Sequence, residues 1–251
     1  MKKLMAANWK MYKTWDEARD TAKAMVRLLA NSMPKDREVL LIPPFTAIRG
    51  VYDAIRDAKG FYVGGQDFYP AAEGAYTGEI SPGQLLDAGC CFALAGHSER
   101  RHVLGESSEL VGKKVAFGLD SGLSMILCVG ETVEERKEGK LTEVVLKQLR
   151  AGLNTAARGF DPEMLVVAYE PVWAIGTGLV AGPKEILEAH KLIRKELLAM
   201  FPDIGSEIRI LYGGSVKADN CGEIIALDNV DGVLVGGASL KADSFSLIVT
   251  A

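Results

Sequence analysis

Short apolar runs that recur along the whole chain constrain its fold more than any other feature. Eight such runs, rich in Val, Ile, Leu and Ala, begin near residues 4, 39, 61, 91, 125, 164, 208 and 230. Each run is too short for a helix, and its hydrophobicity is continuous rather than alternating. This pattern predicts strands that are covered on both faces, as in a parallel sheet.

Amphipathic segments lie between these runs and predict helices. Thr14 can cap a helix over residues 14–30, and Pro183 suits the first turn of another helix that continues to residue 201. The apolar residues of the first segment recur at helical spacing: Ala18, Ala22, Met25, Val26 and Leu29. Strand-like runs that alternate with helical segments predict an α/β protein with a (β/α)8 barrel, ahead of an open doubly wound sheet. Since no linker or composition shift marks a boundary, we expect a single domain over residues 1–251.

Charge and composition argue against several classes of protein. The net charge of −4, without a Lys/Arg stripe, argues against a nucleic-acid partner. No stretch approaches the roughly 18 consecutive apolar residues of a membrane span, and the N-terminal apolar run is too short for a signal peptide. The cysteines form no CxxC pair and have no His at zinc-ligand spacing: Cys90, Cys91, Cys128 and Cys221. We therefore expect no metal site, buried thiols and a cytoplasmic location.

Polar residues and glycine pairs stand where the strand-like runs end. Barrel enzymes carry their sites at the C-terminal ends of the strands, so these residues are expected to meet. They are Asn8, Lys10, Gln66, His97, Glu131, Glu170, Ser215 and the glycine pairs at 213–214 and 236–237. An apolar core needs none of them, which makes the set a candidate site.

Glu170 is the candidate general base of this site. A carboxylate at a strand end can simply cap a helix or pair with a lysine. Here, however, it precedes Pro171 and the apolar residues 172–175, which can form a lid that excludes water. Burial raises the pKa of a carboxylate toward the range of a general base, which suits proton abstraction from carbon.

His97 is the candidate electrophile. It ends a strand and precedes a helix start at Ser98, whose positive dipole end favours a neutral imidazole that can polarise a carbonyl. The other histidines read as non-catalytic, with His190 on a charged helix face and His102 in a basic run.

Lys10 and the glycine pairs are candidates for binding negative charge. Lys10 reads either as a surface lysine or as a group that stabilises an enolate or a phosphate. The pairs 213–214 and 236–237 read either as tight turns or as a phosphate site at the ends of the last two strands. Residues 176–181 match the dinucleotide fingerprint G-x-G-x-x-A, but they follow the strand at too great a distance for a nicotinamide site.

Six motifs occur in one order along the whole chain. They are NWKM at 8, GHSERR at 96, CVGE at 128, AYEPVWAIGTG at 168, YGGS at 212 and VGGASL at 235. In this order and spacing the chain resembles the triosephosphate isomerase family, whose fold is the TIM barrel.

The resemblance implies interconversion of dihydroxyacetone phosphate and D-glyceraldehyde 3-phosphate through an enediolate. It implies that Glu170 shuttles the carbon proton, that His97 is the electrophile, and that Asn8 and Lys10 bind the substrate. The phosphate would be held by Gly176, Ser215, Gly236 and Gly237, without cofactor or metal. The resemblance also implies a homodimer in which the loop at 73–81 inserts next to Asn8 and Lys10 of the partner.

Some positions depart from the usual pattern of the family. Tyr12 and Lys13 stand where Asn-Gly is common, Asp67 stands where Asn is common, and Pro82 opens the next helix. These positions lie near the expected interface and put the strength of the dimer in doubt more than the chemistry. Two other readings remain: another phosphate-binding barrel such as a synthase or aldolase, and a barrel that has lost activity and serves as a binding protein.

Overall fold

Eight parallel strands form a closed barrel in the computed structural model, which describes residues 1–154, 156, 159–175 and 180–251. Neighbouring strands in the barrel follow one another in sequence, and β1 also pairs with β8. The strands are β1 (Lys3–Asn8), β2 (Arg37–Ile42), β3 (Phe61–Gly65), β4 (Phe92–Ala95), β5 (Ser124–Val129), β6 (Leu165–Tyr169), β7 (Arg209–Tyr212) and β8 (Gly232–Val235). The predicted barrel is therefore confirmed, and the open sheet is excluded.

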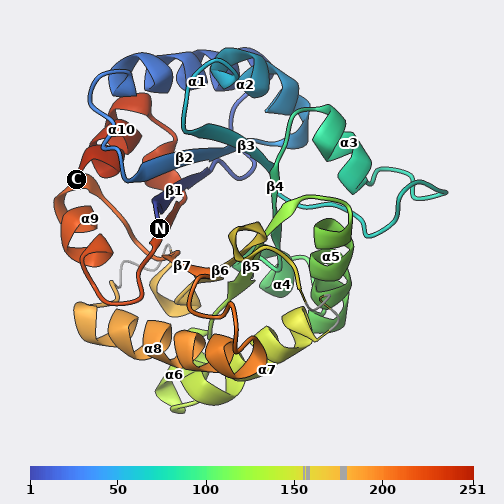
Figure 1. Cartoon of the computed structure of the whole chain (residues 1–251), viewed down its shortest axis with the longest axis vertical. Helices are drawn as coiled ribbons and strands as arrows, with labels where there is room; N and C mark the ends of the chain where they lie inside the picture. The colour runs from blue at the N-terminus through green and yellow to red at the C-terminus, as the bar shows by residue number, and fades with distance from the viewer. Residues whose placement is uncertain (155, 157–158, 176–179) are drawn as a thin grey trace.

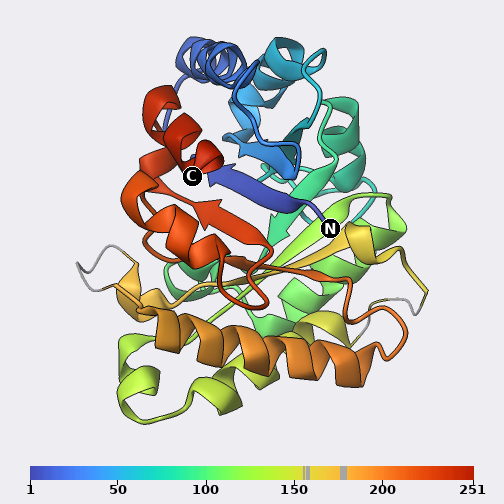
Figure 2. The same cartoon turned by 60° about the vertical axis from the view of Figure 1, so that its left-hand side comes forward.

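Helices surround the barrel in the order of the chain (Figure 1). They are α1 (Trp15–Leu29), α2 (Ile48–Ile55), α3 (Pro82–Asp87), α4 (Ser98–His102), α5 (Ser108–Asp120), α6 (Val133–Lys137), α7 (Leu141–Leu153), α8 (Pro183–Met200), α9 (Ala218–Ile225) and α10 (Ala242–Thr250). Short 3₁₀ turns are η1 (Phe45–Ala47), η2 (Pro162–Met164), η3 (Val172–Ala174) and η4 (Gly237–Ser239). In the turned view, α1 and α8 lie on opposite sides of the strands (Figure 2). Within the described ranges, we find no helix that combines the length and apolarity needed to cross a membrane.

The strands are mainly apolar because both of their faces are buried. Side chains that alternate along each strand belong to two separate clusters, one inside the barrel and one between strands and helices. In β1, Leu4 and Ala6 belong to the inner cluster, whereas Met5 and Ala7 belong to the outer one. The continuous hydrophobicity of the sequence runs follows from this double coverage.

The barrel closes where the first strand meets the last. Leu4 pairs with Gly232 and Ala7 with Val235 in parallel register. The Leu4 backbone N–H donates to the Asp231 carbonyl at 3.0 Å. Closure removes the exposed sheet edges and brings the carboxyl ends of all eight strands to one rim.

Helix α1 forms as the sequence predicts. Thr14 is its N-cap, and its backbone N–H donates to the Glu17 carboxylate at 2.7 Å. Ala18, Ala22, Met25 and Leu29 are buried, while Val26 packs against the core from a half-buried position. Pro183 likewise opens α8, so both predicted helix starts are confirmed.

His190 corrects one of the sequence expectations. Instead of lying on a charged helix face, it is completely buried on the inner side of α8, with its ring edge-on to that of Tyr169. Its Nδ1 lies 2.7 Å from the carbonyl oxygen of Asn229, so we assign the proton to Nδ1. Burial lowers the pKa of His190 to about 4.

Replacing His190 with glutamine is expected to reduce the loss of stability in acid. In the unfolded chain a histidine takes up a proton near pH 6.5, whereas the buried ring does so only near pH 4. The stabilisation is therefore complete above about pH 6.5 and decreases as the pH falls toward 4, by about 3 kcal/mol in all. Urea unfolding at pH 7 and pH 4, at one protein concentration, measures this difference. An identical pH dependence in wild type and variant would contradict the assignment.

Candidate active site

A cavity of about 310 Å³ lies at the C-terminal rim of the barrel. Nine of the site residues predicted from the sequence line it: Asn8, Lys10, His97, Glu170, Gly213, Gly214, Ser215, Gly236 and Gly237. Gln66 and Glu131 lie outside its lining. Gly176 lies outside the described residues, as does most of the 176–181 fingerprint. Strands β1, β4, β6, β7 and β8 thus bring residues from distant parts of the sequence to one cavity.

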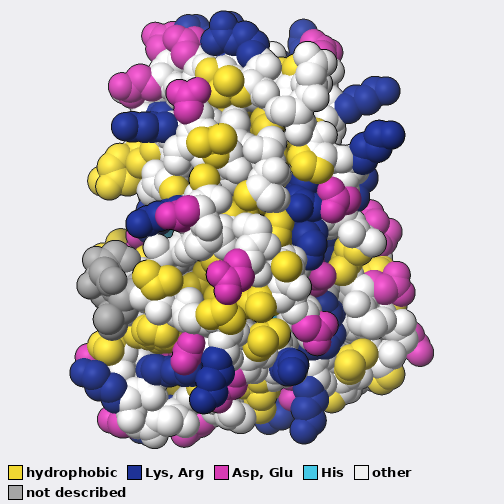
Figure 3. All heavy atoms as spheres, turned by 90° about the vertical axis from the view of Figure 1, so that its left-hand side faces the viewer, with side chains coloured by type: hydrophobic (Ala, Val, Ile, Leu, Met, Phe, Trp, Pro, Cys, Tyr) yellow, Lys and Arg dark blue, Asp and Glu magenta, His cyan; other side chains and the backbone are white. Residues whose placement is uncertain are grey.

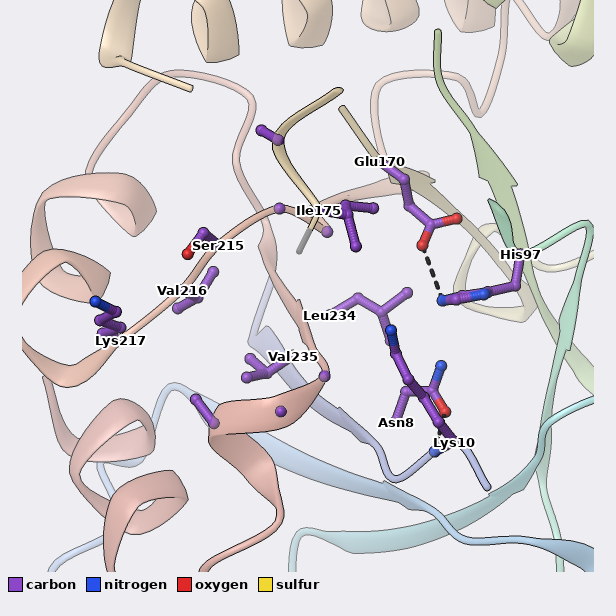
Figure 4. A pocket seen from close by; sticks show the side chains of 16 residues that line it. Asn8, Lys10, His97, Glu170, Ile175, Ser215, Val216, Lys217, Leu234 and Val235 are labelled. Atoms are coloured by element: carbon purple, nitrogen blue, oxygen red, sulfur yellow. Dashed lines mark hydrogen bonds and ion pairs between the residues drawn. The ribbon is translucent and has the colours of Figure 1, made fainter. Parts of the chain in front are cut away.

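The side chains of Glu170 and His97 point toward each other on one side of this cavity (Figure 4). His97 Nε2 lies 3.0 Å from Glu170 Oε1. The second oxygen, Oε2, accepts the backbone N–H of Ser98 at 3.0 Å. The Ser98 hydroxyl also donates to Oε1 at 3.4 Å. The Glu170 side chain is only 3% exposed, so these protein groups take the place of water around the carboxylate.

The pKa of Glu170 differs from the sequence expectation. Burial alone would raise this pKa, as expected, but His97 and the Ser98 N–H stabilise the carboxylate and hold the pKa below its usual value. Desolvation alone does not predict this direction, because the partner of the carboxylate follows β4, which is distant in the sequence. At neutral pH Glu170 is therefore ionised.

His97 is held by the helix that follows it. It is the N-cap of α4, and its Nδ1 accepts the backbone N–H of Glu99 at 3.3 Å. Burial alone would lower the pKa of His97, but the Glu170 charge outweighs burial and raises it. Because Nδ1 accepts a hydrogen bond, we assign the neutral tautomer, in which Nε2 donates to Glu170. The predicted helix start at Ser98 is confirmed.

Lys10 is fixed by contacts of its own backbone. It adopts the left-handed conformation with φ of 51°. Its N–H donates to Asn8 Oδ1 at 2.9 Å, and its carbonyl accepts Gln66 Nε2 at 2.7 Å. Its ammonium group lies 2.6 Å from Glu99 Oε1. These contacts offset the cost of the uncommon backbone conformation and direct the side chain along the cavity wall.

The glycine turns after β7 and β8 form another part of the wall. The Lys10 stem passes so near that a Cβ on Gly236 would lie 3.2 Å from Lys10 Cε. Gly237 begins the turn η4, and the first N–H groups of such a turn lack partners within it. These backbone groups, together with Ser215, give the cavity donors suited to an anion.

Several residues at the site were missed by the sequence argument. Ser98 and Glu99 contact Glu170 and Lys10, and their only signal was their place directly after His97. Leu234 also lines the cavity, as does Ile175, which the sequence had already placed in the apolar segment after Glu170. Leu234 looked like any other strand residue, and only the inward alternation of β8 distinguishes it.

Glu131, another strand-end residue, holds the start of the apolar segment after Glu170. Its Oε1 accepts Trp173 Nε1 at 2.9 Å and the Tyr169 hydroxyl at 3.1 Å. Burial raises the pKa of Glu131. The first turn of the segment, η3, is thereby tied to the end of β5.

Comparison with known proteins agrees with this geometry. The family model described as "Triosephosphate isomerase" matches residues 3–251. A triosephosphate isomerase of Nitratidesulfovibrio vulgaris (strain DSM 19637 / Miyazaki F) is 64% identical over 251 residues, covering 100% of both chains. That of Oleidesulfovibrio alaskensis is 57% identical over the same length, with 100% of both chains covered. That of Geobacter metallireducens is 45% identical over 247 residues, with 98% of this chain and 97% of the relative covered. The chain belongs to the triosephosphate isomerase family.

Proposed function

We propose that this protein interconverts dihydroxyacetone phosphate and D-glyceraldehyde 3-phosphate by moving a proton between adjacent carbons. The observation that carries the proposal is the convergence of Glu170, His97 and Lys10 on one cavity, which the glycine turns after β7 and β8 also line. This set combines a base, a hydrogen-bond donor, a cation and an anion site. A carbonyl next to the reacting carbon makes its proton acidic enough for a carboxylate to remove.

In the proposed reaction, Glu170 takes the proton from the carbon next to the carbonyl. The electron pair moves onto the carbonyl oxygen and forms an enediolate, which His97 Nε2–H and the Lys10 ammonium stabilise. The hydroxyl proton of the enediolate then passes from its own oxygen to the neighbouring one by way of His97 Nε2, and Glu170 returns its proton to the neighbouring carbon. The two transfers together give the other triose phosphate. No atom is gained or lost, and Glu170 ends in its original state.

The contact between His97 and Glu170 gives the site a way to raise the basicity of Glu170. A substrate carbonyl that accepts the His97 Nε2–H removes the partner that lies 3.0 Å from the carboxylate. Burial, which raises the pKa of Glu170, then acts without that opposition. Ile175 and Leu234, which line the same cavity, supply apolar surface that keeps water away.

The phosphate is assigned to the end of the cavity formed by Ser215, Gly236 and Gly237. Gly176, proposed from the sequence as a further contact, lies outside the described residues. A coupled assay of the purified protein with both triose phosphates tests the proposal. Turnover in both directions is the expected result, and no turnover with either substrate would overturn it. The four free cysteines support the cytoplasm as the place of this activity.

A homodimer is proposed as the working form, with residues 73–81 inserted beside Asn8 and Lys10 of the partner. The loop between β3 and α3 projects far from the barrel (Figure 1). Large apolar side chains are exposed on the segments after β1 and α4, with Met11 94% and Val103 77% exposed. Gln66 lies just before the projecting loop, and its side chain binds the carbonyl of Lys10, the residue before Met11. The base of the loop therefore lies close to the exposed Met11. A second copy of the chain would cover both.

Replacing Met11 with glutamate is expected to weaken the dimer at least about 30-fold, because a charge would enter the apolar interface. Sedimentation velocity over a concentration series measures the dissociation constant. The matched control is Leu247→Glu on α10, since Leu247 is 59% exposed and α10 lies on the opposite side from the projecting loop (Figure 1). Acidic and basic side chains are interspersed on the face that carries α9 and α10 (Figure 3). Equal dissociation of both variants would contradict the proposed interface.

A further inference from the structure

Four charged side chains form a closed ring beside the candidate active site. Lys114 Nζ lies 2.6 Å from Asp67 Oδ1 and also contacts Glu106 Oε1. Arg100 closes the ring, with Nη2 2.9 Å from Asp67 Oδ2 and Nε 3.3 Å from Glu106 Oε1. Positive and negative charges alternate around it, so each group has two partners of opposite sign.

The ring is buried, and burying charged groups away from water is energetically unfavourable unless they are paired. The side chains of Lys114 and Glu106 are each 2% exposed, and that of Asp67 is 6% exposed. Removing one member of a buried ion network leaves its partners uncompensated, so the ring holds its members in place strongly. Asp67, which stands where the family commonly has Asn, supplies one of the two negative charges that balance the two positive ones.

The ring meets the site through α4, a helix of a single turn. The Arg100 N–H donates to the His97 carbonyl at 2.8 Å, so Arg100 and His97 belong to the same turn. The backbone of Ser98, also in this turn, binds Glu170. So short a helix has little stability of its own, and its orientation depends on what holds it.

Arg101 holds the other side of the same turn. Its guanidinium donates to the Gly96 carbonyl at 2.8 Å, to Ser108 Oγ at 3.1 Å and to the Cys128 carbonyl at 3.1 Å. It passes so close that a Cβ on Gly96, whose φ is +71°, would lie 2.6 Å from Arg101 Nη2. Two consecutive arginines thus fix α4 from two directions, one to the strand ends and one to the ring.

The ring also joins α4 to the end of β3. Asp67 directly follows Gln66, whose side-chain amide donates to the Lys10 carbonyl at 2.7 Å and to the Ile42 carbonyl at 3.1 Å. A displacement of Asp67 would therefore move Lys10 through Gln66. It would also move His97 through Arg100.

We propose that the ring of Asp67, Lys114, Glu106 and Arg100 is a positioning network that sets His97 against Glu170 and Lys10. This inference rests on the proposed function and adds to it four residues that do not touch the substrate. Their effect is on the reacting geometry, since small displacements of catalytic groups lower the rate strongly.

The test compares kcat and KM of wild type, Asp67→Asn and Arg100→Lys for isomerisation of D-glyceraldehyde 3-phosphate. Both variants are expected to lower kcat about tenfold and to change KM by less than about twofold. Asp67→Asn removes one charge of the ring. Arg100→Lys keeps the charge but loses the planar fork that reaches both carboxylates, and its partly exposed position favours folding. Each variant is assayed at concentrations where sedimentation shows the oligomeric state of wild type.

Asp231→Asn is the matched control. It breaks another ion pair, Asp231 Oδ2 with Arg194 Nη2 at 2.9 Å, at the opposite end of the barrel. It is expected to lower the melting temperature without changing kcat. An unchanged kcat in folded Asp67→Asn and Arg100→Lys, or an equal loss in Asp231→Asn, would overturn the inference alone. A wild-type chain without isomerase activity would overturn the proposed function as well.

Discussion

Replacing Glu170 with glutamine is expected to lower kcat for isomerisation by about 10³-fold, the usual contribution of a general base. Glutamine has nearly the same shape and can still meet the Ser98 N–H, which now lies 3.0 Å from the carboxylate. It cannot accept the carbon proton. The loss should therefore appear in kcat, with the cavity and its phosphate end largely retained.

Two measurements separate this chemical loss from a structural one. Calorimetric titration with glycerol 3-phosphate, which has no carbonyl, should give nearly the same affinity for Glu170→Gln and wild type. The matched control is Glu38→Gln, because Glu38 pairs with Arg209 at 3.0 Å at the opposite end of the barrel. Its turnover should equal that of wild type. Near-normal turnover in Glu170→Gln would exclude Glu170 as the base.

Replacing Lys10 with methionine is expected to lower kcat/KM for isomerisation by about 10³-fold. Methionine keeps much of the stem that passes Gly236 but removes the ammonium charge that lies 2.6 Å from Glu99 Oε1 in the cavity wall. The charge would stabilise both the enediolate and the phosphate. We therefore expect a lower kcat together with a higher KM, unlike the result for Glu170→Gln.

Steady-state kinetics at several ionic strengths test this prediction. Lys23→Met, on the exposed side of α1, changes the net charge equally and serves as the control. It should leave both constants within about twofold of wild type, since surface charges are screened by salt. A comparable loss in the control would mean that overall charge, and not the position of Lys10, governs the rate.

Much of the fold could be predicted because two sequence patterns indicate two kinds of packing. Continuous apolar runs indicate strands buried on both faces, and apolar residues at helical spacing indicate helices buried on one face. The eight apolar runs are continuous because each strand packs both inside and outside the barrel, as Leu4 and Met5 illustrate. Once a barrel is predicted, its topology places every strand end on one rim. For this reason, Asn8, His97 and Glu170 could be grouped without any knowledge of distances.

The remaining features depend on contacts between segments that no local pattern connects. The pKa of Glu170 is lowered by His97 and Ser98 at the start of α4, so burial alone predicts the wrong direction. His190 follows a helical pattern with charged neighbours, yet its face of α8 packs onto Tyr169. In the sequence, Asp67 differed from the residue common in the family and lay near the expected dimer interface, but nothing indicated its partner. The structure pairs it with Lys114.

The pairing of β1 with β8 has a consequence for how the protein is made. Leu4 leaves the ribosome early, but its partner Gly232 is among the last residues to appear. At about 5–20 residues per second, the growing chain holds β1 without this neighbour for on the order of ten to fifty seconds. During that interval one edge of this mainly apolar strand has no partner from its own sheet. Cellular folding of this protein should therefore depend on the speed of translation and on chaperones that cover the nascent strand.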